Sequence, residues 1–206
     1  MVIEPKFINE SSLQAGDVLI SYARLMMGEP GCETGYSHAA IYLGSGEILE
    51  SDTSGVKKSM VEDVLRVYDH IAVLRSHNSW SSSRIGRLKD FASRQIGKKF
   101  NIYALPRIEF LRQKSAENSY REISDYFEGL SAPVETERNS YFCSELVASA
   151  FIDADVITKS AAILFKPETL LPIDIAKDKA FGFFVGYIAR DSAYSVPDDD
   201  WFRTNV

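Results

Sequence analysis

The sequence predicts an α+β fold, in which a small antiparallel sheet or partial barrel packs against the helix that carries Cys143. Two observations support this fold class. Short runs with strand composition follow one another between residues 18 and 75, and apolar residues with helical spacing recur further along the chain. Neither a repeat nor a Gly/Ser/Pro linker divides the 206 residues, so residues 1–206 are expected to form a single domain.

Composition and charge limit the classes of partner. Hydrophobic residues make up 45% of the chain and charged residues 25%, which are ordinary values for a soluble globular protein. The net charge of −6, without a basic run, argues against a nucleic-acid binder and against a protein that binds anionic membranes. No apolar stretch has the length of a membrane span, so we expect no stable membrane insertion.

The cysteine content predicts a reducing compartment. Cys32 and Cys143 are too few for a disulfide-stapled scaffold, and they lack the paired spacing of a zinc site. We therefore expect neither a metal nor another cofactor. Residues 1–7 contain no apolar core of the kind that a signal peptide requires, which predicts a cytoplasmic protein, with leaderless export as the open alternative.

The first half of the chain is expected to consist mainly of short strands. The sequence Gly44-Ser45-Gly46 predicts a three-residue hairpin loop, because Gly adopts the left-handed conformation without strain. Residues 28–36 are rich in Gly and predict a loop of the kind that often lines sites. The strands are predicted at residues 18–21, 37–43, 48–51, 56–60 and 70–75.

The second half is expected to be mainly helical. Apolar residues from Ile85 to Ile96 have helical spacing and end at Gly97, a good helix stop. Residues 113–140 are polar and acidic with only a weak apolar face, which predicts an insertion or a lid. The aromatic-rich residues 181–189 predict a buried strand, and the tail from Asp191 is expected to be a solvated end.

Cys143 is the strongest candidate for a reactive residue. Phe142, Leu146 and Val147 begin an apolar helical stripe, and Asn139 and Ser140 stand ahead of it as candidate N-caps. Cys143 therefore lies in a first helical turn, where unpaired N–H groups and the helix dipole favour a thiolate over a thiol. The alternative is a buried structural cysteine, because free Cys is among the most buried residue types.

His38 is the candidate base, and Glu50 is the candidate residue that orients it. His38 opens a strand directly after the Gly-rich loop. With a three-residue loop, Leu43 faces Glu47, Ala40 faces Glu50, and His38 becomes the diagonal neighbour of Glu50, which is close enough for a hydrogen bond. A two-residue loop would turn Glu50 to the other face. Glu50 is otherwise a solvated charge near a strand end.

Three segments resemble the motif blocks of a known family. The segments at residues 16–19, 37–50 and 141–147 look like those of the NlpC/P60 papain-like cysteine hydrolases. They look most like the circularly permuted branch, which includes YiiX-like proteins and enzymes related to lecithin retinol acyltransferase. In that branch the His strand precedes the Cys helix, as His38 precedes Cys143 here. The resemblance implies a circularly permuted papain-like fold.

The resemblance also implies roles for individual residues. Cys143 becomes the nucleophile, His38 the general base and acid, and Glu50 the third residue of the triad. The backbone N–H of Cys143 is expected to contribute to an oxyanion hole. Tyr36, Ser144 and Asp17 are further candidates for oxyanion stabilisation or substrate binding.

The implied activity is hydrolysis of a peptide or isopeptide amide, such as a fragment of cell-wall type, through a thioester acyl-enzyme. The expected partner is therefore a small peptide, amide or ester substrate, whereas the sequence leaves the oligomeric state open. One rival function is acyl transfer or phospholipase-like thioester chemistry on a lipid ester. Another is a binding module that keeps the fold without turnover, although such a module would not need all three triad residues.

Overall fold

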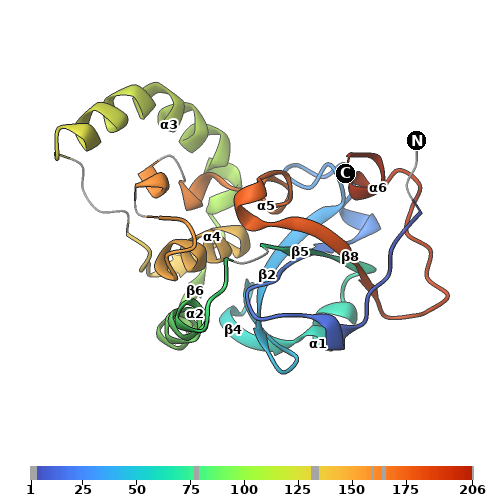
Figure 1. The fold of residues 1–206 in the computed structure, drawn as a ribbon. Coiled ribbons are helices and arrows are strands. Elements are labelled where there is room, and N and C mark those ends of the chain that lie inside the picture. Colours follow the sequence, from blue (N-terminus) through green and yellow to red (C-terminus); the bar gives the residue numbers. More distant parts are fainter. Residues whose placement is uncertain (1–3, 77–78, 131–134, 159, 164–165, 206) are drawn as a thin grey trace.

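The computed structural model describes residues 4–76, 79–130, 135–158, 160–163 and 166–205. Its main element is a curved six-stranded sheet with the order β4-β3-β2-β1-β5-β8, in which each neighbouring pair is antiparallel (Figure 1). The predicted α+β class is confirmed. The strands are β1 (Val18–Tyr22), β2 (Tyr36–Gly44), β3 (Glu47–Asp52), β4 (Gly55–Met60), β5 (His70–Arg75) and β8 (Phe183–Ala189).

Helices and a second, small sheet complete the fold. In the small sheet, β6 (Lys99–Phe100) pairs with β7 (Ser140–Tyr141) in parallel. No helix in the described part of the chain combines the length and apolar character needed to cross a membrane. The α-helices are α1 (Val61–Leu65), α2 (Ser82–Gln95), α3 (Ala104–Phe127), α4 (Cys143–Asp153), α5 (Pro172–Lys177) and α6 (Trp201–Asn205). Short 3₁₀ segments are η1 (Glu10–Ser12), η2 (Arg24–Met26), η3 (Ala161–Ile163), η4 (Pro167–Thr169) and η5 (Lys179–Phe181).

The sheet is buried on both faces, which explains why its strands are so apolar. On one face, Ile20 and Ile41 share a core with Phe91 of α2 and Leu146 of α4. On the other face, alternate residues such as Leu19 and Ala40 pack with α1. All five residues of β1 are buried as a result. Because each buried aliphatic side chain contributes roughly 1.5–3 kcal/mol, this two-sided packing holds the strands in one register.

The β2–β3 hairpin confirms the predicted pairing of Ala40 with Glu50, although its turn differs from the prediction. The loop has two residues, Ser45 and Gly46, whose φ angles of 56° and 82° are both positive, as a type I′ turn requires. Tyr42 pairs with Ile48 and Gly44 with Glu47, so Leu43 is an additional residue in a bulge and does not face Glu47. The bulge restores the alternation that the shorter loop would have reversed. Glu50 therefore lies on the face of His38.

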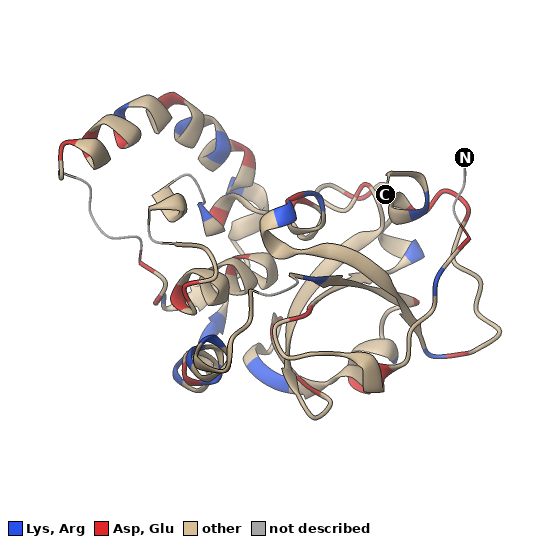
Figure 2. Cartoon of the chain, viewed as in Figure 1, with Lys and Arg blue, Asp and Glu red and all other residues tan. Residues whose placement is uncertain are grey.

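The described part of residues 113–140 begins within a longer helix. Their first part continues α3, which begins at Ala104 and contacts η3 and η4. In Figure 2 acidic and basic residues alternate with others along α3, and Tyr120 and Phe127 are 86% and 82% exposed. Residues 131–134 lie outside the described part of the chain. The interpretation as an insertion or lid remains a prediction, as does the single-domain organisation.

The expectation of a solvated tail from Asp191 was wrong for its last part. Asp200 is buried and accepts hydrogen bonds from the hydroxyls of Tyr36 and Tyr187, at 2.8 and 2.6 Å. His70 lies 3.0 Å from the same Tyr36 hydroxyl through its Nε2 atom. The run of three aspartates concealed this arrangement, because only the tertiary fold brings buried hydroxyl donors to Asp200.

Candidate active site

Cys143 is the first residue of α4, as the helical period predicted. The helix begins there because Glu145 caps it: its Oε2 atom accepts a hydrogen bond of 3.0 Å from the backbone N–H of Phe142. Phe142 is thus the N-cap, and neither Asn139 nor Ser140 takes that position. The N–H groups of the first turn have no partner within the helix, so they point towards the thiol end of α4.

His38 connects Cys143 with Glu50. Its Nε2 atom lies 2.8 Å from Oε2 of Glu50, and the Cys143 side chain is close enough to affect the pKa of the ring. Burial disfavours the charged imidazole, but the hydrogen bonds and charges of Cys143 and Glu50 outweigh it and raise the pKa of His38 to about 10. The arrangement therefore favours a protonated imidazole at neutral pH.

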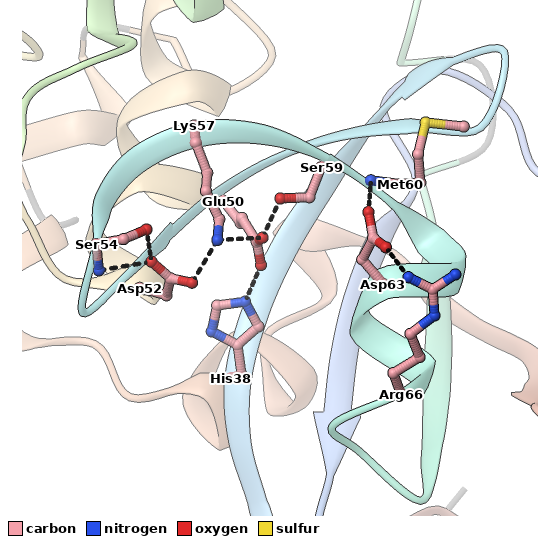
Figure 3. Close-up of polar contacts among 9 residues, drawn as sticks. All are labelled: His38, Glu50, Asp52, Ser54, Lys57, Ser59, Met60, Asp63 and Arg66. Carbon is pink, nitrogen blue, oxygen red and sulfur yellow. Dashed lines mark hydrogen bonds and ion pairs between the residues drawn. The ribbon is translucent and has the colours of Figure 1, made fainter.

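Glu50 is buried and stays charged because several donors surround it. Burial alone would raise its pKa, but the hydrogen bond and charge of His38, the Ser59 hydroxyl and the charge of Lys57 together lower the pKa of Glu50 below its ordinary value. Lys57 also forms an ion pair with Asp52, at 2.7 Å. Figure 3 shows these side chains converging from β2, β3 and β4. A charged Glu50 is what an orienting residue for an imidazolium requires.

The three further candidates lie elsewhere, in structural roles. Between Ser21 and Tyr22 the β1–β2 register shifts, and the extra residue Ser37 turns Tyr36 into the core that also holds Ala39 and Ile41. The Tyr36 hydroxyl donates to Asp200, so these contacts give no support to its expected role near the thiol, which remains a prediction.

Ser144 and Asp17 have their polar atoms engaged away from the triad. The Ser144 hydroxyl donates to the carbonyl oxygen of Leu170 at 2.5 Å. Asp17 forms an ion pair with Arg75 at 2.6 Å and accepts a hydrogen bond from the backbone N–H of Gln14. Neither residue lines the cavity beside Cys143. Both side chains hold local structure, and their expected roles in oxyanion stabilisation or substrate binding remain predictions that these contacts do not support.

A cavity of about 520 Å³ opens beside the triad. Its wall combines charged and polar side chains with the apolar side chains of Val64, Val67, Phe100 and Phe142. None of the described residues of 113–140 lines it, so the structure gives no support to a lid over Cys143. The lining residues are Ser37, His38, Glu50, Ser51, Asp52, Thr53, Lys57, Ser59, Asp63, Val64, Val67, Tyr68, Phe100, Phe142 and Cys143.

Sequence reasoning missed three residues of this site: Lys57, Ser59 and Tyr68. The Tyr68 ring stacks on the His38 imidazole, with ring centroids 5.5 Å apart and planes within 9°. Lys57 is the strand partner of Glu50. A register argument across the second hairpin, like the one used for the first, would have found Lys57 and Ser59. Tyr68 lies in the connection after α1, where no pattern in the sequence points to the site.

Cys32 is the second thiol near the site. It is buried, and both burial and the nearby Cys143 raise its pKa to about 11. The two cysteines are free thiols. In the described part of the chain, no group of three or more His, Cys, Asp or Glu side chains is arranged to hold a metal ion.

Comparison with known proteins points to one family. Residues 12–105 match the model of a family described as "Permuted papain-like amidase enzyme, YaeF/YiiX, C92 family". This span contains His38 and Glu50 but ends before Cys143. A solved structure titled as metalloprotein yiiX from Escherichia coli O157:H7 matches with a TM-score of 0.43 and 16% identity, over 67% of this chain and 64% of that one. This chain thus covers less than two thirds of that protein's length.

No curated protein matches the chain. The family match and the order of the triad segments, with the His strand before the Cys helix, agree with each other. Over residues 12–105 the chain therefore resembles the permuted papain-like amidase family, as its sequence predicted.

Proposed function

We propose that the protein is a cysteine-dependent amide hydrolase, a peptidase or amidase, that acts through Cys143, His38 and Glu50. One observation carries this proposal: His38 is hydrogen-bonded to Glu50, and both line the same cavity as Cys143, which is close enough to help raise the pKa of His38. A nucleophile, a base and a group that orients the base form the usual unit of thiol catalysis. The match to a family described as amidases supports the same reaction type.

The first half of the reaction forms a thioester. The Cys143 thiolate attacks the amide carbonyl carbon, and the carbonyl electrons move onto oxygen. First-turn N–H groups of α4, including that of Cys143, stabilise this oxyanion. The His38 imidazolium then donates its proton to the leaving nitrogen as the C–N bond breaks. The raised pKa of His38 keeps that proton available until this step.

The second half regenerates the thiol. Neutral His38 takes a proton from water as the water oxygen attacks the thioester carbon, and the acid product leaves as the C–S bond breaks. Glu50 supports the imidazolium that forms again and holds the ring through Nε2, at 2.8 Å. The His38 imidazole therefore serves as acid in one half-reaction and as base in the other.

The cavity supports a hydrophilic amide, such as a small peptide or isopeptide, more than a lipid ester. Its wall carries Asp52, Lys57 and Asp63, and a buried acyl chain would leave such charges desolvated. Val67 and Phe100 lie on the same wall and leave room for an apolar group on such an amide. The free state of both cysteines supports action in a reducing compartment such as the cytoplasm.

Turnover of a panel of short peptide amides, matched esters and a phosphatidylcholine vesicle tests this proposal. We expect the wild type to cleave amides, with no turnover in the Cys143→Ala variant. Cleavage of the vesicle lipid alone would assign the lipid-ester function instead. Binding of peptides without turnover of any panel member would indicate a binding module.

A further inference from the structure

Glu50 is held by more than its partner in the triad. Its Oε2 atom receives the hydrogen bond of His38, whereas its Oε1 atom accepts a hydrogen bond from the Ser59 hydroxyl and lies 3.7 Å from the Lys57 ammonium. Each carboxylate oxygen thus has its own set of donors. A carboxyl group held only at Oε2 would be free to rotate about its terminal torsion, which is a soft one.

The strand register explains how Ser59 reaches Glu50. On β4, Lys57 stands directly opposite Glu50 and Ser59 stands opposite Ile48. Ser59 is therefore the diagonal neighbour of Glu50 on the same face of the sheet, within reach of its side chain. Figure 3 shows Ser59 directed at the Glu50 oxygen from β4, while His38 approaches the other oxygen from β2.

Lys57 is a weaker candidate for holding Glu50. Its ammonium lies closer to Asp52, at 2.7 Å, than to Glu50, and its side chain is 40% exposed. Asp52 is itself fixed by the backbone N–H and hydroxyl of Ser54, at 2.8 and 2.6 Å. Lys57 and Asp52 therefore neutralise each other at the rim. Ser59 carries no charge, so it fixes Oε1 without cancelling the negative charge that His38 needs.

We propose that Ser59 is a positioning residue, which holds the Glu50 carboxylate so that Oε2 stays aligned with the imidazole of His38. This inference rests on the proposed function for its effect on turnover, but not for its effect on the His38 ring. Ser59 lies on the edge strand of the sheet and its hydroxyl bonds to Glu50, so its effect on the thiol is expected to pass through Glu50 and His38.

Three variants test the proposal. Ser59→Ala removes the hydroxyl, and Ser59→Thr retains it on a side chain that suits a strand. Ser54→Ala is the matched control, because its hydroxyl bonds to Asp52 rather than to Glu50 and its side chain does not line the cavity. We expect Ser59→Ala to lower kcat about 2- to 12-fold, the factor that one ordinary hydrogen bond provides, without changing KM.

Ser59→Thr is expected to recover most of the lost kcat, and Ser54→Ala to remain at the wild-type value. The proposal is overturned if Ser59→Ala keeps the wild-type kcat, or if Ser59→Thr loses as much kcat as Ser59→Ala. Thermal unfolding of each variant shows whether the strand itself is weakened, and a loss of kcat that only follows the fraction unfolded also overturns the proposal.

A measurement without substrate separates this inference from the proposed function. In the ¹⁵N spectrum of the histidine rings, we expect the titration midpoint and Nε2 shift of His38 to change in Ser59→Ala and to stay unchanged in Ser54→Ala. The groups that face this ring are Cys143, Glu50 and Tyr68, and none of them is altered in either variant. An unchanged His38 signal in Ser59→Ala would refute the positioning role, even in a protein that hydrolyses amides.

Discussion

Replacement of Glu50 by Gln tests the orienting role most simply. The amide keeps the size of the side chain and can still accept a hydrogen bond from Nε2 of His38, which lies 2.8 Å from the carboxylate in the wild type. It loses the charge that stabilises the imidazolium. We therefore expect a folded protein in which only the reaction is slowed.

The expected fall in kcat/KM follows from the charge that the hydrogen bond loses. A hydrogen bond to a charged group contributes about 1.5–3 kcal/mol, and each 1.4 kcal/mol changes a rate or equilibrium about tenfold. The Gln amide keeps a neutral hydrogen bond, which contributes about 0.5–1.5 kcal/mol, so the loss is about 1–1.5 kcal/mol and kcat/KM falls roughly 5- to 13-fold. The matched control is Glu47→Gln on the same strand, whose carboxylate pairs with Lys58 near the surface at 3.1 Å.

The pH profile adds a second signature. Because the pKa of His38 is raised to about 10, the imidazolium persists above the ordinary range of histidine and is lost only as pH rises through about 10. The alkaline limb of kcat/KM is therefore expected near that pH in the wild type. Without the Glu50 charge the imidazolium is less stable, so the limb moves to lower pH in Glu50→Gln.

The assay is steady-state hydrolysis of the best peptide amide from the panel, measured from pH 5 to pH 11 for wild type, Glu50→Gln and Glu47→Gln. An unchanged rate and an unchanged alkaline limb in Glu50→Gln would refute the orienting role of Glu50. A fall in rate that Glu47→Gln shares would show that the strand, rather than the triad, had been disturbed.

Three further predictions concern the rest of the molecule. His38→Ala should lower kcat by about 10²- to 10⁴-fold. Adding Glu50→Gln to Cys143→Ala should change the rate little, because the effects of residues in one catalytic unit are not additive. Additive losses in rate assays would contradict the proposed triad. Asp200→Ala should destabilise the fold by about 2–4 kcal/mol in denaturant titration, because the buried hydroxyls of Tyr36 and Tyr187 lose their acceptor. Asp199 is exposed, so Asp199→Ala should leave the stability unchanged. Equal unfolding midpoints for the two variants would show that the tail does not stabilise the core. Replacing residues 115–136 with a Gly/Ser linker should leave the thermal midpoint nearly unchanged, since Tyr120, Phe127 and Leu130 are exposed. A wider substrate range in that variant would support a lid over the cavity, although none of the described residues of this segment lines the cavity.

The pairing of His38 with Glu50 was predictable because alternation along a strand is strict between bulges. The predicted register nevertheless depended on two differences that cancel: the loop is one residue shorter than expected, and Leu43 forms a bulge. Near Tyr36 the alternation of β2 is also broken by a bulge, but there no second irregularity restores it. A single bulge at Ser37 turned Tyr36 into the core, and local sequence contains no clear signal for such a bulge.

The position of Cys143 at a helix start was predictable from the apolar period that follows it. Its cap was not, because a Glu two residues after Cys143 is common and gains its meaning only from the N–H of Phe142. Burial of Asp200 and the stacking of Tyr68 on His38 were equally hidden. Both depend on segments that are distant in the sequence and meet only in the folded chain.

The central claim is that Cys143 is a thiol activated by His38. Alkylation by iodoacetamide near neutral pH, with each adduct mapped and its rate measured by mass spectrometry, tests that claim most directly. Cys143 is predicted to react first and to become markedly slower in His38→Ala, while Cys32 remains slow because burial raises its pKa to about 11. Preferential labelling of Cys32, or a Cys143 rate that does not change in His38→Ala, would contradict the account.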